Sequence, residues 1–297
     1  MKFMKYKWLY FLISAVVILP GIFSLVKWGL KPSIDFTGGT LWELEFKNFN
    51  QGSSVISEVL NENKIAYSSI QPSGEKRFLI KTQPLEREQI SKLTEKIAEK
   101  AKEKPTEIRF ETVGPLLGKE LIRKTIIAIL LAAGFILFYV WKQFKEPMYG
   151  ICAILAMFHD TFVLLGTFSL LGHFAGVEID TLYVTAVLTI LSFSVHDTVV
   201  VYDRIRESQK IFPKVPFEDL VDKAVTETLS RSINNSMTII IMLFALYLLG
   251  GSTTKWFTFA LLIGTISGTY SSTFTAAPLL VVWNKIEEKI AFRKKIR

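Results

Sequence analysis

Six long apolar segments restrict this chain to folds that cross a lipid bilayer several times. Each segment has about the 17–25 residues that a membrane-spanning helix needs. A soluble domain of this size rarely carries several such runs, and half of the 297 residues are hydrophobic. The segments lie at residues 8–28, 121–141, 148–172, 181–202, 231–249 and 256–283. We therefore expect a polytopic α-helical membrane protein with six transmembrane helices.

The first apolar segment resembles a signal peptide because lysines precede it. Its apolar run, from Trp8 to Val26, is however longer than the apolar core of a signal peptide. Pro20-Gly21 also offers no Ala-x-Ala cleavage site. We therefore interpret this segment as a retained first helix.

Basic residues gather in alternate connections between the apolar segments. The N-terminus, the loops after the second and fourth segments, and the tail at 285–297 carry most of them, whereas 173–180 has none and 250–255 has only Lys255. The positive-inside rule then places both termini in the cytoplasm. This distribution accounts for the net charge of +8, so no nucleic-acid partner is needed to explain it.

The segment 30–118 would lie on the outer side and has the pattern of a small α+β domain. Residues 40–47 alternate between apolar and charged side chains, as a half-buried strand does. A helix near 55–60, strands at 65–71 and 76–82 around a turn at Pro72-Ser-Gly74, a helix at 90–101 and a strand at 107–111 follow. This βαββαβ order predicts a ferredoxin-like fold. The segment has no histidine or cysteine, so a docking role is expected rather than chemistry.

The chain is thus predicted to have four parts. These are a first transmembrane helix with a cytoplasmic N-terminus (1–29), an extracytoplasmic ferredoxin-like domain (30–118), a five-helix transmembrane bundle (119–284) and a basic cytoplasmic tail (285–297).

Asp197 lies inside the fourth apolar segment, several residues before its charged end. An ionised carboxylate at that depth costs at least about 2.5–3.5 kcal/mol on insertion scales. It needs a partner, a water path or a proton, so Asp197 is a candidate functional residue. The alternative is that Asp197 only forms a hydrogen bond with a neighbouring helix.

Two tripeptides repeat, His159-Asp160-Thr161 and His196-Asp197-Thr198. A metal site would need three or four convergent ligands, which these pairs do not by themselves supply. An aspartyl protease would need two facing carboxylates that share a proton. Asp160 lies about 12 residues from the cytoplasmic end of its segment and Asp197 about six from Asp203, so at 1.5 Å per residue their depths differ by roughly 9 Å. A proton or ion relay therefore fits better.

Arg231 is the candidate partner of Asp197. The amphipathic stretch 217–229 continues into Arg231, so we predict that the fifth helix begins inside the cytoplasmic loop and carries Arg231 to the depth of Asp197. Arg231, Asn234, Asn235 and Thr238 recur with helical spacing and predict one polar stripe. A guanidinium opposite Asp197 would stabilise its anion, and its withdrawal would favour proton uptake. Alternatively, Arg231 snorkels to the lipid headgroups.

Small and hydroxyl residues are frequent in the last segment. Gly264, Gly268 and the Ser/Thr cluster from Thr269 to Thr275 are consistent with close helix packing or with a wet cavity, and we favour packing.

The chain is similar to the SecF-type members of the SecD/SecF family of protein-export membrane proteins, within the RND superfamily. The matching motifs are Ile34-Asp35-Phe36-Thr37-Gly38-Gly39, His159-Asp160 with Gly166, Asp197 to Glu207, Leu229-Ser-Arg231-Ser-Ile-Asn234, Gly250-Gly251, Ala260 to Gly264 and Gly268 to Ser272.

The resemblance implies six spans, an external ferredoxin-like domain and a location in the bacterial plasma (inner) membrane. It implies the partners SecD, the SecYEG translocon, a YajC-like accessory protein and unfolded preprotein, in a complex that uses the proton-motive force. It implies no enzymatic activity, no cofactor and no metal.

The resemblance also assigns roles to residues. Asp197 and Arg231 match the essential membrane carboxylate and arginine of the family, and Asp35, Gly38 and Gly39 belong to a motif at the junction of the first span and the domain. His196 stands where asparagine is usual, Asn235 where threonine is common and Ser33 where glycine is often found. His196 could alter the pH at which Asp197 responds, and the coupling ion, proton or sodium, stays open.

Three other functions remain as alternatives. An RND-type exporter of lipids or small molecules would share the relay, a membrane scaffold would not need Asp197, and an intramembrane protease would need Asp160 and Asp197 to face each other.

Overall fold

The computed structural model describes residues 2–47, 53–73, 76–144 and 146–296 of the chain. It divides into two compact units. A helical unit comprises Met1–Lys31 and Ala128–Arg297, and a smaller unit comprises Pro32–Ile127.

Among the described residues, five helices are long and apolar enough to cross a membrane: Met4–Lys27, Leu116–Gln143, Pro147–Ala175, Thr181–Ile211 and Phe217–Leu249. They contain α1 (Lys7–Lys27), α5 (Pro115–Gln143), α6 (Pro147–Ala175), α7 (Thr181–Ile211) and α8 (Phe217–Leu249). The unbroken course of α8 from Phe217 confirms that the fifth helix begins inside the preceding loop. The sixth apolar segment is covered by α9 (Ser252–Ser271), the π-helical η2 (Ser272–Ala276) and α10 (Ala277–Ile296).

Close approach of small residues holds the helical unit together. A Cβ atom added to Gly166 of α6 would lie 2.5 Å from the Cα of Gly21 in α1, which no side chain tolerates. Near these glycines, Ser24 and Ser169 share a 2.7 Å hydrogen bond between α1 and α6. A Cβ on Gly264 of α9 would lie 2.3 Å from the side chain of Ile190 in α7. The predicted close packing at Gly264 is therefore confirmed.

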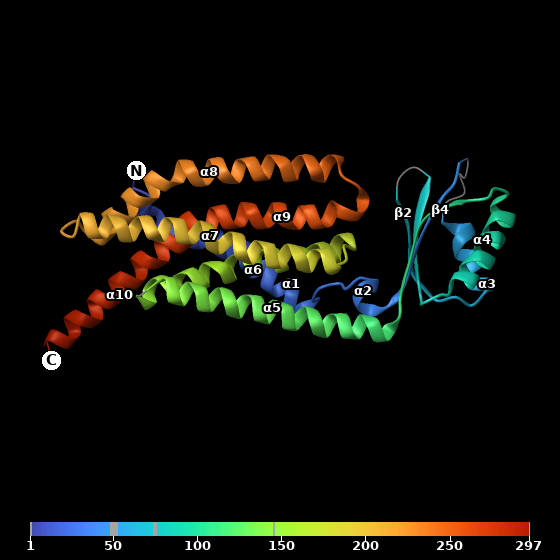
Figure 1. Cartoon of the computed structure of the whole chain (residues 1–297), viewed down its shortest axis with the longest axis horizontal. Helices are drawn as coiled ribbons and strands as arrows, with labels where there is room; N and C mark the ends of the chain where they lie inside the picture. The colour runs from blue at the N-terminus through green and yellow to red at the C-terminus, as the bar shows by residue number, and fades with distance from the viewer. Residues whose placement is uncertain (1, 48–52, 74–75, 145, 297) are drawn as a thin grey trace. The chain divides into compact units, whose positions relative to one another are not determined.

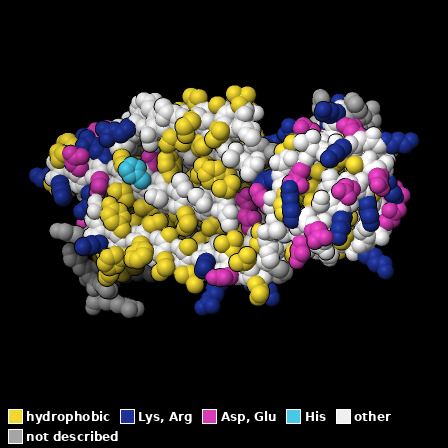
Figure 2. All heavy atoms as spheres, turned by 45° about the vertical axis from the view of Figure 1, so that its right-hand side comes forward, with side chains coloured by type: hydrophobic (Ala, Val, Ile, Leu, Met, Phe, Trp, Pro, Cys, Tyr) yellow, Lys and Arg dark blue, Asp and Glu magenta, His cyan; other side chains and the backbone are white. Residues whose placement is uncertain are grey.

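The outer surface of the helical unit is apolar. None of the apolar window of α5 is buried, and Phe135 and Leu130 are 70% and 67% exposed. Figure 2 shows hydrophobic side chains over much of the visible face of this unit. Such a surface suits the lipid interior, because lipid tails are as apolar as these side chains and the side chains need not be buried.

The smaller unit is a four-stranded antiparallel sheet with two helices on one face (Figure 1). Its elements are β1 (Gly39–Glu45), α3 (Ser54–Glu62), β2 (Tyr67–Pro72), β3 (Arg77–Thr82), α4 (Arg87–Ala101) and β4 (Thr106–Val113), and the strands lie in the order β2-β3-β1-β4. Trp42, Leu44 and Ile80 of the sheet pack with Ile56 of α3 and Ile90 of α4 in its core. The turn predicted at Pro72-Ser-Gly74 extends to Gly74, which lies outside the described residues.

The junction motif forms a short turn of helix followed by a tight bend. The Oγ of Ser33 accepts the backbone N–H of Asp35 at 3.2 Å at the start of α2 (Ile34–Thr37). Gly38 and Gly39 then have φ angles of +76° and +143°, which L side chains rarely adopt. A Cβ on Gly39 would also lie 2.8 Å from the carbonyl oxygen of Thr82. The two glycines are therefore required by the backbone path into β1.

Candidate functional site

Asp197 lies on α7 and is nearly buried, with 6% of its surface exposed. Its Oδ2 accepts the hydroxyl of Ser232 in α8 at 2.6 Å and the hydroxyl of Ser272 in η2 at 2.7 Å. Two helices besides its own therefore donate hydrogen bonds to this carboxylate.

Arg231 and Asp197 line one pocket of about 260 Å³ between α7 and α8. Within the described residues no ion pair of 4.0 Å or less joins the two side chains. Arg231 is exposed at the surface of this chain, and Asn235 lines the pocket beside it. The structure thus places Arg231 near the carboxylate without direct contact.

The predicted polar stripe of Arg231, Asn234, Asn235 and Thr238 lies on the exposed side of α8. The buried polar side of the helix carries Thr228, Ser232 and Ser236 instead. The two stripes differ by one residue, which is a rotation of about 100° about the helix axis. The four predicted residues thus share one side of α8, and Ser232 on the neighbouring side is the residue of α8 that bonds the carboxylate.

Asp160 on α6 is also buried and is 1% exposed. Its Oδ1 accepts the hydroxyl of Ser267 at 2.6 Å, and its Oδ2 accepts the hydroxyls of Ser194 and Ser271, each at 2.6 Å. Ser194 belongs to α7, whereas Ser267 and Ser271 belong to α9. Asp160 therefore ties three helices together.

His159 extends this network to α1. Its Nδ1 lies 3.0 Å from Asp160 Oδ1, and its Nε2 lies 3.0 Å from the Oγ of Ser14. The imidazole is stacked with the ring of Tyr270, whose hydroxyl donates to the carbonyl oxygen of Tyr10 at 2.9 Å. The helix α1 is thus joined to α6 and α9 through polar side chains.

The two carboxylates lie closer in depth than the sequence predicted. Asp160 bonds Ser194, which precedes Asp197 on α7 by three residues, or about 4.5 Å of helix at 1.5 Å per residue. The predicted difference of roughly 9 Å was wrong because it measured each residue from the charged end of its segment, and α7 extends to Ile211.

Each carboxylate nevertheless has its own donors, and no hydrogen bond between Asp160 and Asp197 is present among the residues that the structure describes. That arrangement does not support a shared-proton dyad. Over the same described residues, no group of three or more His, Cys, Asp or Glu side chains could hold a metal ion.

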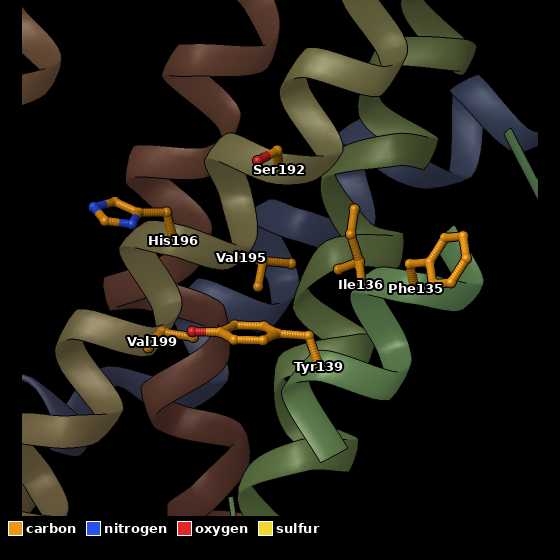
Figure 3. A pocket seen from close by; sticks show the side chains of 7 residues that line it. All are labelled: Phe135, Ile136, Tyr139, Ser192, Val195, His196 and Val199. Atoms are coloured by element: carbon orange, nitrogen blue, oxygen red, sulfur yellow. The ribbon is translucent and has the colours of Figure 1, made fainter. Parts of the chain in front are cut away.

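His196 lies on the exposed side of α7 and lines two pockets. One is the pocket of Asp197 and Arg231. The other pocket, of about 310 Å³, lies between α5 and α7. Figure 3 shows Tyr139 of α5 extending toward α7, while the imidazole of His196 points away from α5. His196 is therefore next to Asp197 in sequence but does not take part in the described hydrogen bonds of the carboxylate.

Serines that were not predicted from the sequence donate to both carboxylates. Ser267, Ser271 and Ser272 lie in the small-residue part of the last segment, which we had interpreted as packing. This interpretation was incomplete because the same residues also donate to Asp160 and Asp197. A signal was present, since Ser267 and Ser271 are four residues apart and so share one face of the helix.

The π-helical η2 begins at Ser272, which donates to Asp197. The residue before it, Ser271, donates to Asp160. Such π-helical turns are rare and occur frequently at functional sites.

Residues 93–286 match the family model described as protein export membrane protein SecD/SecF, C-terminal. A protein translocase subunit SecF from Thermobaculum terrenum is 40% identical over 98% of this chain and 96% of its own length. A second, from Anaerolinea thermophila, is 37% identical over 97% of this chain and 96% of its own length. The crystal structure of SecDF, a translocon-associated membrane protein from Thermus thermophilus, superposes with a TM-score of 0.83 at 31% identity. The match covers 96% of this chain and 39% of the SecDF chain.

Proposed function

The chain belongs to the SecD/SecF family of protein-export membrane proteins, and we propose that it is a SecF-type accessory subunit of the Sec protein translocase. It works with a SecD-type subunit and uses the proton-motive force to promote the export and release of preproteins. Relatives named as translocase subunits along nearly the whole chain support this function. None of them is named as a lipid or small-molecule exporter.

The observation that carries the mechanism is the environment of Asp197. The carboxylate is nearly buried, receives hydroxyl bonds from Ser232 and Ser272, and shares a pocket with Arg231. A membrane carboxylate held by neutral donors can bind and release a proton without breaking a fixed ion pair. When Arg231 moves toward Asp197 it stabilises the anion, and when it moves away the carboxylate takes up a proton.

The SecD-type partner completes this site. The chain corresponds to 39% of the SecDF chain, so a SecD half accounts for much of the remainder. Arg231, Asn234, Asn235 and Thr238, with His196, form an exposed polar surface on α7 and α8. Such side chains are costly against lipid, so this surface faces the partner subunit. SecYEG, a YajC-like protein and unfolded preprotein are the further partners, and the subunit has no catalytic role.

The topology that goes with this function has six spans and cytoplasmic termini. α9, η2 and the first turns of α10 form the sixth span, a continuous helical run over the last apolar segment. The element order β1-α3-β2-β3-α4-β4 and the strand order β2-β3-β1-β4 support a ferredoxin-like domain. Residues 30–118 then lie outside the bacterial plasma membrane, residues 1–29 and 119–284 form the transmembrane part, and the basic tail 285–297 lies inside.

Replacement of Asp197 by asparagine tests this function. Inner-membrane vesicles that carry the variant with its SecD partner and SecYEG should export a preprotein at the same rate with and without a proton gradient. Asp203→Asn on the same helix is the matched control, because its side chain is 48% exposed and already paired with Arg206. Gradient-dependent export at the wild-type level in Asp197→Asn would refute the relay.

A further inference from the structure

Asp160 has no part in the proton switch described above, yet it is the more completely bonded of the two carboxylates. It accepts hydroxyls from Ser194, Ser267 and Ser271 and faces the Nδ1 of His159. A carboxylate can accept about four hydrogen bonds, so these donors satisfy it. Among the described residues, no lysine or arginine lies within ion-pair distance of its carboxylate.

The donors of Asp160 are connected directly to the Asp197 site. Ser271, which donates to Asp160, is followed in the chain by Ser272, which donates to Asp197. On α7, Ser194 donates to Asp160 one helical turn before Asp197 itself. Asp160 therefore fixes both the helix that carries the switch carboxylate and the segment that carries its hydroxyl donor.

The π-helical turn begins at the serine that makes this connection. The N–H of Ser272 still bonds the carbonyl oxygen of Gly268, as in a regular α-helix, and the π-helical η2 starts at the same residue. The bond from Ser271 to Asp160, immediately before η2, supplies an anchor at the point where the regular helix ends.

We propose that Asp160 is a positioning residue for the Asp197 switch, which it holds in place through Ser271 and Ser194. The proposal rests on the proposed function, because it assigns Asp160 to the same proton-coupled site. In this arrangement Asp160 keeps its three hydroxyl bonds throughout the cycle, while Asp197 gains and loses its proton against a fixed Ser272 hydroxyl.

A nucleophilic role for the path Ser14–His159–Asp160 does not fit the structure, although the order of bonds is that of a serine-hydrolase triad. Ser14 is 7% exposed, and its Oγ also lies 3.4 Å from the hydroxyl of Thr275 and 3.5 Å from that of Tyr270. A hydroxyl enclosed in this way by other side chains has no access to a substrate. The path instead joins α1 to the anchor.

Asparagine is an informative replacement for Asp160 because it keeps the shape but not the acceptor capacity. The amide offers one oxygen, and its NH2 group would face hydroxyls that donate in the native protein. Asp160→Asn should therefore release Ser271 and, through it, Ser272.

The test measures the reactivity of Asp197 itself. A hydrophobic carbodiimide, which modifies protonated carboxyl groups, is added to membranes that carry the full complex at one fixed pH, and mass spectrometry quantifies modification at Asp197. Loss of one hydroxyl donor to the ionised form should raise this modification about fivefold in Asp160→Asn and in Ser271→Ala. Gradient-dependent export should fall in both variants.

Ser169→Ala is the matched control. Ser169 is also a buried hydroxyl of α6, and its bond to Ser24 joins α6 to α1 without contact to either carboxylate. Unchanged Asp197 modification in both Asp160→Asn and Ser271→Ala would overturn the proposal, as would an equal change in Ser169→Ala. If Asp160→Asn does not accumulate in the membrane, Ser271→Ala tests the same link, because it removes the hydroxyl that joins Asp160 to η2. Asp197→Asn separately tests the proposed function, so the failure of one can be distinguished from the failure of the other.

Discussion

Ser271 and Ser272 are neighbours in the chain but donate hydrogen bonds to different carboxylates, Ser271 to Asp160 on α6 and Ser272 to Asp197 on α7. Consecutive residues of a helix point about 100° apart, so two neighbouring residues where α9 meets η2 can bond two different helices. This pair of contacts makes two aspartates, 37 residues apart in the sequence, parts of one buried polar site.

Removal of either hydroxyl donor should weaken the Asp197 site. Ser232→Ala and Ser272→Ala each remove one bond to Asp197 Oδ2, and we expect each to reduce gradient-dependent export several-fold, in proportion to about 1 kcal/mol per bond. The control is Ser208→Ala, which removes a buried serine near the end of α7, the helix that carries Asp197. Export measured with and without a gradient distinguishes a loss of coupling from a general loss of activity, which would lower both rates equally.

Arg231→Met should abolish gradient-dependent export while leaving export without a gradient unchanged. The guanidinium lines the pocket of Asp197, and methionine removes its charge but keeps an unbranched side chain. Lys223→Met on the exposed side of the same α8 is the control. If Arg231→Met exports as well as Lys223→Met does, Arg231 is only a residue that reaches the headgroups.

Gly166→Ala should destabilise the contact between α1 and α6. Its Cβ would lie 2.5 Å from the Cα of Gly21, so the helices must separate, at a cost of about 1–3 kcal/mol. Thermal unfolding in detergent should show a lower midpoint for Gly166→Ala than for Gly134→Ala on α5, where no atom lies within 4 Å. Equal midpoints would contradict the close approach.

Leu44→Ala should destabilise the smaller unit by about 2–5 kcal/mol, because Leu44 is fully buried in its core. Limited proteolysis of the full chain should then cut this unit at a lower protease concentration. Ile108→Ala on β4, where the side chain is 43% exposed, should leave the cleavage pattern unchanged. Equal sensitivity of the two variants would argue against the assigned core.

The helices were predictable because long apolar runs can satisfy their backbone groups in lipid only as helices. Asp197 was predictable as a candidate functional residue because a carboxylate inside an apolar segment is visible in the sequence, and its cost in the membrane does not depend on knowing its neighbours in space. The rotation of α8 was not, since Arg231, Asn234 and Asn235 interleave with Ser232 and Ser236. Either set can face inward by sequence, and the contacts of α7 with Ser232 decide it.

The anchor at Asp160 was harder to predict for a related reason. Serine is small enough to favour close packing and polar enough to bond a carboxylate, so a Ser-rich helix face is compatible with both roles. The depth of Asp160 relative to Asp197 also depends on how far each helix extends beyond the membrane, which the apolar segments do not define.

Proton movement during preprotein export is the direct test of whether Asp197 carries the proton. Vesicles that contain this chain, its SecD partner and SecYEG, loaded with a pH-sensitive dye, are given a proton gradient and then a preprotein. We predict preprotein-dependent proton flow in the wild type and in Asp203→Asn, and none in Asp197→Asn. Preprotein-dependent proton flow of wild-type size in Asp197→Asn would contradict the assignment of Asp197 as the residue that carries the proton.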